Sequence, residues 1–390
     1  MITFDSLFLF KFTSCFTSIT SRPSIRLKFR SSGPDCSKKV ENNIRVDVKS
    51  THMFAYLLIL LIALTFMIPS QLTLAQYQSG FIPINASKPL LREFPVPSGS
   101  QPHDVAPAKN GSVWYTAQGS GELGLLKPAT GKTHHISLGQ GSAPHGVIVG
   151  PDGSPWITDG GLNAIVRVNP ETEEVRVFPL PENVGNPNLN TATFDHKGVL
   201  WFTGQSGIYG RLDPASGKMD VFNAPRGVGP YGISTTHKGS VYFASLAGGY
   251  VAHINLNTGN ATVLQPPTQD QGARRVWSDS QVRVWFSEWN AGKLGLYNPF
   301  NNTWKEWQLP GNNPQPYAIF VDDKDMIWLS DFGSNALVRF DPSQQKFEVF
   351  SLPSPGANVR QLLGRPGEVW GAESGIDKLV VVEKIDCRCM

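Results

Sequence analysis

The sequence predicts an all-β protein, a seven-bladed β-propeller whose blades are sheets of four strands. Glycine, proline and aromatic residues are frequent together, with 38 Gly, 30 Pro, 10 Trp and 22 Phe in 390 residues, while only 17% of the residues are charged. This composition favours many short strands joined by tight turns. An aromatic residue recurs every 41 to 45 residues, at Trp114, Trp156, Trp201, Tyr242, Trp285, Trp328 and Trp370. Seven repeats of this length, without a window of helical periodicity, are typical of a propeller.

Each repeat contains four extended segments in a fixed order. The second repeat begins with Pro144-His145-Gly146, turns at Asp152-Gly153 and continues into the segment around Trp156. Its third segment is AIVRVNP and its fourth is VRVFPLP, and similar runs such as KLGLYNP and FEVFSLP follow in other repeats. Turns rich in Gly, Asn and Asp separate the segments, as expected for antiparallel strands. We expect the recurrent aromatic residues to pack between neighbouring blades.

The order of the segments also predicts how the ring closes. The seventh repeat starts near Ala357 and ends at Met390 without a fourth segment. A copy of that missing segment, LREFPVP at residues 91–97, lies ahead of the first repeat. We therefore expect residues 90–390 to form the propeller, with the N-terminal strand completing the last blade. This arrangement removes an exposed sheet edge.

The segment ahead of the propeller has the features of a secretory signal. Residues 54–68 are apolar almost without a break, Lys49 and His52 precede them, and Thr73-Leu74-Ala75 follows as a small-x-small cleavage pattern. This order of basic, apolar and small residues is typical of a signal peptide. We predict a signal peptide at residues 53–75, cleaved before Gln76.

Two further expectations concern the N-terminal region. Residues 1–52 are interpreted as an upstream extension, with the hypothesis that translation starts at Met53, and residues 76–89 as a short linker. The alternative to cleavage is a membrane anchor formed by residues 54–69. Because the positive charges lie upstream, both alternatives leave the propeller secreted or extracytoplasmic.

Charge and cysteine content exclude other classes of protein. Residues 1–75 carry nine Lys or Arg and four acidic residues, which leaves 25 basic and 27 acidic residues in the rest of the chain. A propeller of this charge has no basic surface for nucleic acid. Two of the four cysteines, Cys15 and Cys36, precede the predicted signal, and Cys387 and Cys389 lie at the C-terminal end, so they provide no disulfide framework. We expect a monomer.

Candidate functional residues lie at one rim of the predicted ring. A hairpin joins the first two strands of each blade, so the start of the first and the end of the second lie at the same rim. Residues eleven positions before each recurrent aromatic form one ring there: His103, His145, Asn190, Tyr231, Arg274, Tyr317 and Val359. Residues three positions after it form a second ring: Ala117, Asp159, Gly204, Ser245, Glu288, Asp331 and Glu373.

These two rings predict a polar site at the mouth of the channel. His103 and His145 are one blade apart, and imidazole suits proton transfer because its pKa lies near neutral pH. We assign substrate binding to four residues of the first ring, Asn190, Tyr231, Arg274 and Tyr317. Three carboxylates of the second ring, Asp159, Glu288 and Asp331, are candidate oxygen ligands for Mg²⁺. The alternative is that the rim His and Asp residues only cap strand ends and bind each other.

The repeat resembles that of the virginiamycin B lyases, also called streptogramin lyases, across residues 90–385. The stretch Asp152-Gly153 to Trp156-Ile157-Thr158-Asp159, followed by Asn163-Ala164-Ile165-Val166-Arg167 and Phe178-Pro179-Leu180-Pro181, carries the resemblance best. The resemblance implies a seven-bladed propeller that opens a cyclic depsipeptide by elimination at its ester bond, with magnesium. It also implies that a His of a Pro-His-Gly start acts as base and that a second His holds the substrate.

The sequence departs from the family pattern in its last blade. The lyases have their Pro-His-Gly base in that blade, with a Glu two residues before it, whereas this chain has Gly356-Ala357-Asn358-Val359-Arg360 there. The adjacent His pair occurs in the first two blades instead, and Ala143 stands where the Glu would precede His145. The site is therefore expected at a different place around the ring.

Three functions fit these observations. The first is a lyase that opens a small-molecule ester or lactone, with His145 as base, His103 positioning the substrate and Mg²⁺ stabilising the negative charge. The second is a hydrolase similar to the sugar-lactone hydrolases, in which a metal activates water. The third is a propeller without catalytic activity that binds a peptide, glycan or other envelope ligand.

Overall fold

The computed structural model describes residues 25–26, 45–46 and 89–383, and the chain divides into two units, Met1–Pro83 and Ile84–Met390. In the first unit the described residues are two short antiparallel strands, β1 (Ile25–Arg26) and β2 (Arg45–Val46). The expected signal peptide or anchor, most of the upstream extension and nearly all of the linker lie outside the described residues. Within the described ranges, no helix is long and apolar enough to cross a membrane.

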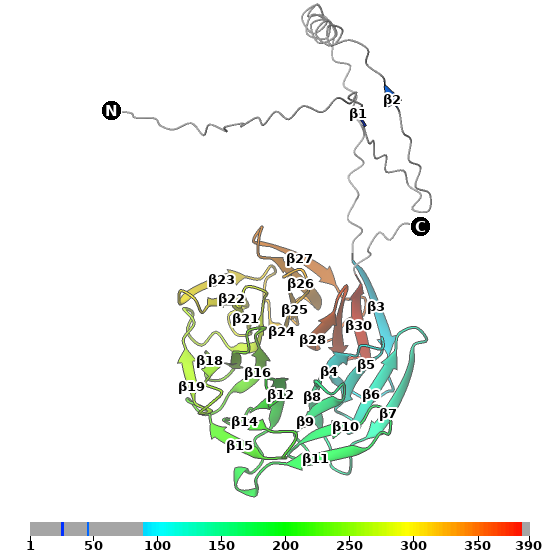
Figure 1. Ribbon diagram of the computed structural model, residues 1–390, viewed down its shortest axis with the longest axis vertical. Coiled ribbons are helices and arrows are strands. Elements are labelled where there is room, and N and C mark those ends of the chain that lie inside the picture. Colours follow the sequence, from blue (N-terminus) through cyan, green and yellow to red (C-terminus); the bar gives the residue numbers. More distant parts are fainter. Residues whose placement is uncertain (1–24, 27–44, 47–88, 384–390) are drawn as a thin grey trace, which may run out of the picture. The chain divides into compact units, whose positions relative to one another are not determined.

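The second unit is a ring of seven antiparallel sheets of four strands each, which confirms the predicted fold (Figure 1). Blades one and two are β4 (Pro102–Pro107), β5 (Val113–Ala117), β6 (Glu122–Lys127), β7 (Lys132–Ser137), β8 (Pro144–Val149), β9 (Pro155–Asp159), β10 (Ala164–Val168) and β11 (Val175–Pro179). Blades three and four are β12 (Leu189–Phe194), β13 (Leu200–Gly204), β14 (Ile208–Leu212), β15 (Met219–Asn223), β16 (Pro230–Thr235), β17 (Val241–Ser245), β18 (Tyr250–Ile254) and β19 (Ala261–Leu264). A 3-10 helix, η1 (Glu182–Val184), lies between blades two and three.

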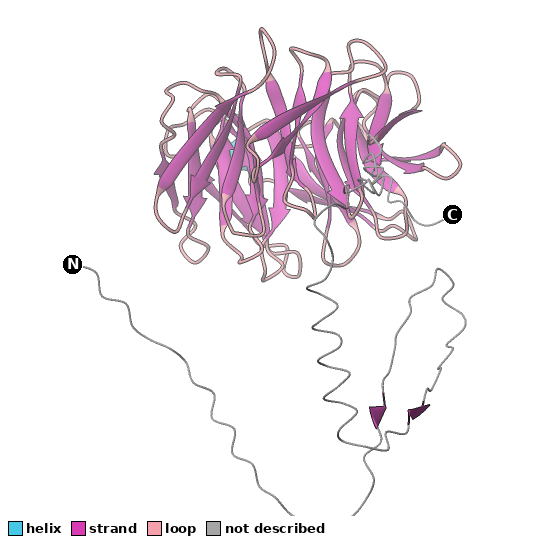
Figure 2. Cartoon of the chain, turned by 90° about the horizontal axis from the view of Figure 1, so that it is seen from above, coloured by secondary structure: helices cyan, strands magenta, loops and turns pink. Residues whose placement is uncertain are grey.

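The remaining three blades follow the same order along the chain. Blades five and six are β20 (Ala273–Ser278), β21 (Val284–Glu288), β22 (Lys293–Asn298), β23 (Thr303–Gln308), β24 (Pro316–Val321), β25 (Ile327–Asp331), β26 (Ala336–Asp341) and β27 (Lys346–Ser351). Blade seven is β28 (Val359–Arg365), β29 (Glu368–Glu373), β30 (Lys378–Glu383) and β3 (Leu90–Pro95). The N-terminal β3 pairs with the C-terminal β30 from Leu90↔Glu383 to Pro95↔Lys378, so the two ends of the unit meet in one sheet. Figure 2 shows the strands crossing the thickness of the disc.

The recurrent aromatic residues pack where one blade meets the next. Trp328 of blade six lies in one buried cluster with Val359 and Leu362 of blade seven. Trp201 likewise joins Phe243 of the following blade. In several blades the indole nitrogen also donates to an Asp of the preceding hairpin turn, as in the 2.9 Å bond from Trp328 Nε1 to Asp322 Oδ2. The same residue that fills the core therefore fixes the turn.

Candidate functional site

A β-bulge interrupts the first strand of every blade at the rim predicted to carry the site. In blade one the register jumps from Pro102↔Ala117 to Val105↔Tyr115, which leaves His103 and Asp104 opposite a single residue. The bulges of blades five and seven lie at the same place, between Ala273 and Val276 and between Val359 and Leu362. A bulge re-aims side chains and is frequent beside functional sites. Here the bulges of blades one and five bring His103, Asp104 and Arg275 into contact with one another.

In five of the seven blades a hydroxyl group on the second strand holds the bulge in place. Thr116 Oγ1 accepts a bond from the backbone N–H of Asp104 at 2.9 Å and donates to the backbone carbonyl of His145, in the next blade, at 2.8 Å. Ser330 makes the equivalent pair of bonds to Ala318 and Val359. In these blades the Thr or Ser two residues after the recurrent aromatic thus joins the bulge of its own blade to the first strand of the next blade.

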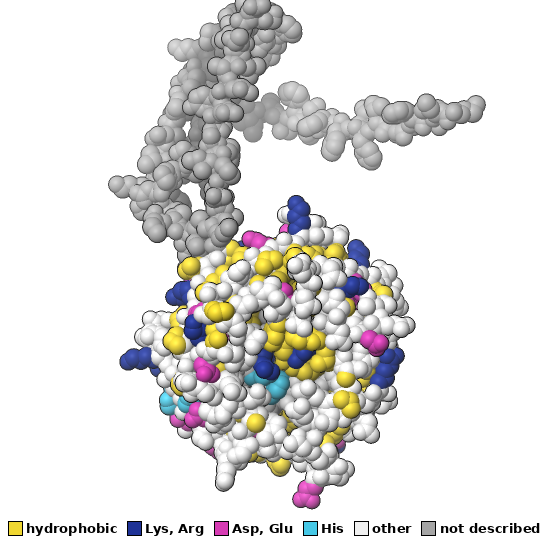
Figure 3. All heavy atoms as spheres, turned by 180° about the vertical axis from the view of Figure 1, so that it is seen from behind, with side chains coloured by type: hydrophobic (Ala, Val, Ile, Leu, Met, Phe, Trp, Pro, Cys, Tyr) yellow, Lys and Arg dark blue, Asp and Glu magenta, His cyan; other side chains and the backbone are white. Residues whose placement is uncertain are grey.

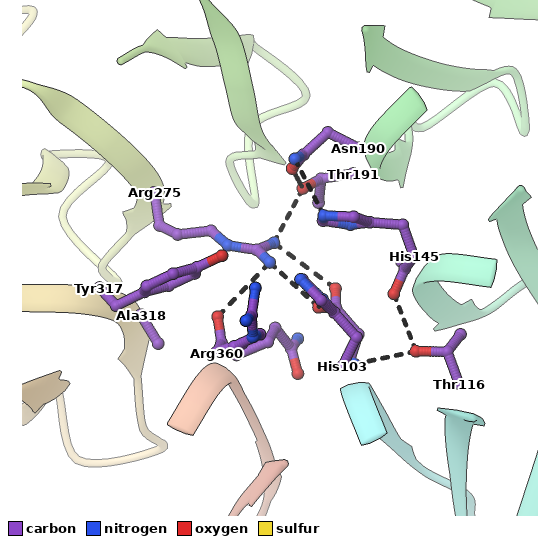
Figure 4. A network of polar contacts seen from close by, with 12 residues as sticks. His103, Thr116, His145, Asn190, Thr191, Arg275, Tyr317, Ala318 and Arg360 are labelled. Carbon is purple, nitrogen blue, oxygen red and sulfur yellow. Dashed lines mark hydrogen bonds and ion pairs between the residues drawn. The ribbon is translucent and has the colours of Figure 1, made fainter. Parts of the chain in front are cut away.

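The centre of the site is a buried group of two histidines, an aspartate and an arginine (Figure 4). The rings of His103 and His145 lie 3.7 Å apart between centroids. His103 Nδ1 lies 2.8 Å from Asp104 Oδ1, and Arg275 of blade five reaches across the channel to the same oxygen at 3.0 Å. All four residues are buried, with exposed fractions of 1% for His103 and Asp104, 4% for Arg275 and 6% for His145. The prediction that the two histidines lie together is therefore confirmed.

The hydrogen bonds around this group have a defined direction, because arginine can only donate. Arg275 Nη1 donates to Thr191 Oγ1 at 2.8 Å, and Thr191 then donates to Asn190 Oδ1 at 2.7 Å. The Asn190 amide nitrogen consequently faces His145 Nε2, at 3.2 Å, and donates to it. The neutral His145 ring must then carry its proton on Nδ1, which is buried and has no partner.

The tautomer of His103 follows from its carboxylate partner. Asp104 accepts, so the proton of the neutral His103 ring lies on Nδ1 and its Nε2 keeps a lone pair. Burial lowers the pKa of His103 well below its usual value, and the positive charges of Arg275, Arg360 and Arg274 lower it further. Burial, and then the neighbouring His103, have the same effect on the pKa of His145. Both imidazoles are therefore neutral near neutral pH.

The four residues assigned to substrate binding lie around this centre. Arg274 sits over the rings of Tyr317, Trp289 and Tyr231, at 3.5, 4.5 and 4.6 Å from its guanidinium carbon to the centroids. The hydroxyl groups of Tyr231 and Tyr317 are hydrogen-bonded to each other. Burial raises the pKa of Tyr231 to about 12, whereas the adjacent arginines outweigh burial at Tyr317 and lower its pKa. Figure 3 shows hydrophobic side chains gathered around basic and histidine side chains at the centre of one face.

A pocket opens on the His145 side of this mouth. Its volume is ≈ 440 Å³, and its lining includes Gln118, His145, Gly161 and Asn188. A smaller cavity of ≈ 60 Å³ lies deeper in the channel, behind Arg275 and Asp104. The cross-channel ion pair therefore separates the open mouth from the interior of the ring.

The three carboxylates predicted as metal ligands do not converge on the histidines. Asp159 accepts hydrogen bonds from three backbone N–H groups, those of Ala143, Gly161 and Leu162. These bonds stabilise the loops at the end of its own strand. Asp331 does the same for the backbone N–H groups of Gln315 and Gly333. Glu288 is fully buried, and burial together with the neighbouring Glu306 raises its pKa to about 8. The reason is geometric: these residues end the second strand, whereas the bulged first strand lines the axis.

The chemistry of the central group does not suit Mg²⁺. Among the described residues, the set of three possible ligand atoms within 4.8 Å of one another comes from His103, Asp104 and His145. Mg²⁺ prefers an octahedron of oxygen atoms, while this set offers two imidazole nitrogens and one carboxylate. That carboxylate is already neutralised by Arg275. A second positive charge at Asp104 would have to displace a buried ion pair.

Three residues of the site were missed in the sequence. Asp104 and Arg275 each follow a ring residue directly and point to the axis only because of the bulge. In blade seven the bulge contains Arg360 and not the expected Val359. Val359 pairs with Glu373, and this pair corresponds to the pair Pro102↔Ala117 that precedes the bulge of blade one. The first hairpin of blade seven is one residue shorter, so counting back from Trp370 gives the wrong position.

The fold and the buried centre define a class, the seven-bladed propellers with a polar site at one mouth of the central channel. Within this class the chain belongs to the virginiamycin B lyase family, whose model matches residues 62–303. The resemblance proposed from the repeat is thus confirmed. A search of curated protein sequences gave no match.

Several solved structures share this fold. The virginiamycin B lyase of Staphylococcus aureus is 20% identical, with 76% of this chain and 100% of that chain covered and a TM-score of 0.71. A streptogramin B lyase is 22% identical, with 76% and 98% covered and a TM-score of 0.70. An extracellular domain assigned to a hybrid two-component system of B. thetaiotaomicron is 17% identical, with 76% and 43% covered and a TM-score of 0.62.

Proposed function

We propose that this protein is an exported carbon–oxygen lyase that opens an ester or lactone by elimination at the channel mouth. The observation that carries the proposal is the pair of buried, neutral histidines, one of which is held by Asp104. A neutral imidazole oriented by a carboxylate is a common arrangement for a general base. Membership of the virginiamycin B lyase family supports the reaction class.

The hydrogen-bond directions favour His103, rather than His145, as the base. His103 Nε2 keeps its lone pair while Asp104 holds Nδ1 and orients the ring. The lone pair of His145 Nε2 already accepts a bond from Asn190. We therefore assign proton abstraction to His103 and positioning of the substrate to His145, which reverses the roles expected from the sequence.

The reaction can be written with these groups alone. His103 Nε2 takes the proton from the carbon next to a carbonyl, and the C–H electrons form a double bond to the neighbouring carbon. The bond from that carbon to the ester oxygen breaks with its electron pair, and the leaving group departs as a carboxylate. The negative charge developing on the carbonyl lies beside arginine side chains, where electrostatic stabilisation lowers the barrier.

The test is turnover of a cyclic depsipeptide lactone by the full chain, followed by mass spectrometry. Elimination leaves the mass unchanged and creates a dehydro residue, whereas hydrolysis adds one water. His103→Gln should lower kcat about 10²–10⁴-fold. His134→Gln is the matched control, because His134 lies half-exposed on the outer strand β7 and pairs with Glu173. Full activity in His103→Gln together with loss in His145→Gln would restore the opposite assignment.

A binding protein without catalytic activity is the second candidate. It is favoured by the burial of both imidazoles, which leaves His103 only 1% exposed behind the mouth. Structural neighbours include a propeller described as YCF48 bound to D1 peptide, 13% identical with a TM-score of 0.61, and the extracellular domain assigned to a hybrid two-component system. Saturable binding of the lactone without any product in the wild type would support this candidate, and addition of water would support a lactone hydrolase.

A further inference from the structure

The channel mouth carries three arginines, and one of them is paired with a carboxylate among the described residues. Three arginines project from the bulges, two from blade five and one from blade seven. Arg275 forms its ion pair with Asp104. Arg274 and Arg360 form no ion pair with any carboxylate in the described part of the chain. Basic side chains held close together and partly buried without counter-charge are costly, unless an anion joins them.

Arg274 is held rigidly and retains unused donor capacity. Its guanidinium group lies among Tyr317, Trp289 and Tyr231, and Nη2 donates to the Tyr231 hydroxyl at 3.0 Å. Its Nε is buried and has no acceptor. Stacking on aromatic rings fixes the plane of the guanidinium fork, which reduces the entropy lost when it binds a planar anion.

Arg360 approaches the same place from blade seven. Its Nε donates to Ser374 Oγ at 2.7 Å, which leaves the two terminal nitrogens for other partners. Figure 4 shows the side chain directed towards His103 and the Arg275 guanidinium. The charges of Arg274 and Arg360 both lower the pKa values of His103 and Tyr317, as expected if the two side chains converge.

We propose that Arg274 and Arg360 form a carboxylate subsite at the channel mouth, with Trp289 and Phe332 contacting the apolar body of the ligand. Trp289 and Phe332 are partly exposed and pack edge to face, with centroids 5.4 Å apart. Arginine binds carboxylates through two parallel hydrogen bonds, which gives both affinity and orientation. The inference rests on the proposed function, because ester elimination releases a carboxylate beside the base.

The test measures the binding of benzoate to the full chain by titration calorimetry. Benzamide has the same shape without the charge, and inorganic phosphate has charge without an apolar body. Benzoate should bind, benzamide should bind at least about tenfold more weakly, and Arg274→Gln and Arg360→Gln should each weaken benzoate binding by about tenfold or more. Arg274→Lys keeps the charge but not the fork, so an intermediate affinity is expected.

Arg339→Gln is the matched control, because Arg339 stacks on Trp328 and Phe350 but is paired with Glu348. This variant should bind benzoate as the wild type does. Phosphate binding as tight as benzoate binding, or benzoate binding unaffected by both Gln variants, would overturn the subsite. Benzoate binding without lactone turnover would uphold the subsite and reject the lyase. Lactone turnover without benzoate binding would uphold the lyase and reject the subsite.

Discussion

His103 Nδ1 lies 2.8 Å from Asp104 Oδ1, although the two residues are adjacent in one strand. Successive side chains of a regular strand point to opposite faces, so such a contact requires the local break in register at this bulge. The consequence is a base and its orienting carboxylate supplied by two consecutive residues. Arg275, from the opposite side of the ring, completes the group.

Asp104→Asn should destabilise the propeller strongly. The change leaves Arg275 buried without a counter-charge, and loss of one partner of a buried ion pair costs about 3–5 kcal/mol. Urea unfolding followed by tryptophan fluorescence measures this loss. Asp220→Asn is the control, since the Arg211–Asp220 pair is partly exposed and should contribute under about 1 kcal/mol. Equal losses in the two variants would argue against a special role for the central pair.

Removal of the N-terminal strand should cost much more stability than removal of the segment before it. A chain lacking residues 90–97 loses β3, its ladder with β30 and the buried Phe94. Truncating a buried Phe alone costs about 3–5 kcal/mol, and loss of the strand also exposes an edge. A chain lacking residues 76–86 is the control. The prediction is checked by comparing Tm values, and similar values for both deletions would contradict it.

Glu288 and Glu373 should make the protein less stable as the pH rises. Burial raises the pKa of each to about 8, with a further contribution from Glu306 and Glu93 respectively. The folded state then binds more protons than the unfolded state between their ordinary pKa and about 8. The contribution of these two protonated carboxyl groups to the free energy of unfolding is therefore fully present at acidic pH and is lost as the pH rises through this window.

The variants Glu288→Gln and Glu373→Gln stay neutral and should be the more stable proteins at pH 8–9, with a flatter dependence on pH. The opposing charges nearest the two sites are Lys293 and Lys378. Unfolding curves recorded from pH 5 to pH 9 test this expectation. Glu171→Gln, at an exposed position, is the control and should follow the wild type. A wild-type stability that rises across this window would refute the assignment.

Chelation by EDTA should leave lactone turnover unchanged. The central group offers two imidazoles and a carboxylate engaged by Arg275, and the other candidate carboxylates serve their own loops or are buried apart. The measurement is the initial rate before and after EDTA treatment and dialysis. Loss of activity that Mg²⁺ restores would show that oxygen ligands outside this group hold a metal.

The protein recovered from its native host should begin at or near Gln76. The apolar run at residues 54–68 and the following small residues predict cleavage there. N-terminal sequencing of protein from the medium or envelope fraction measures the start. An intact N-terminus at Met1 on a membrane-bound protein would favour the anchor instead.

The sequence alone determined the propeller, because the repeat encodes its own packing and connections. The recurrent aromatic residue fills the space between blades, and in five blades a Thr or Ser two residues later bonds to the next blade. The orphan copy at 91–97 predicts a strand that the seventh repeat lacks. The adjacency of His103 and His145 also followed from the repeat, since equivalent positions on neighbouring blades must be close in a ring.

Only the tertiary structure decided which polar groups share the site. In a regular strand Asp104 and Arg275 would point to the face opposite that of the preceding residues, His103 and Arg274. The bulges change this, so that Asp104 and Arg275 also point to the channel. A hairpin shortened by one residue moves Arg360 into the ring in place of Val359. Asp159 and Asp331 are residue types that bind metals, but their carboxylates accept hydrogen bonds from backbone N–H groups of their own loops. The position of each polar side chain therefore depends on the backbone register and on which hydrogen bonds form within and between blades. Neither can be read from residue spacing in the sequence.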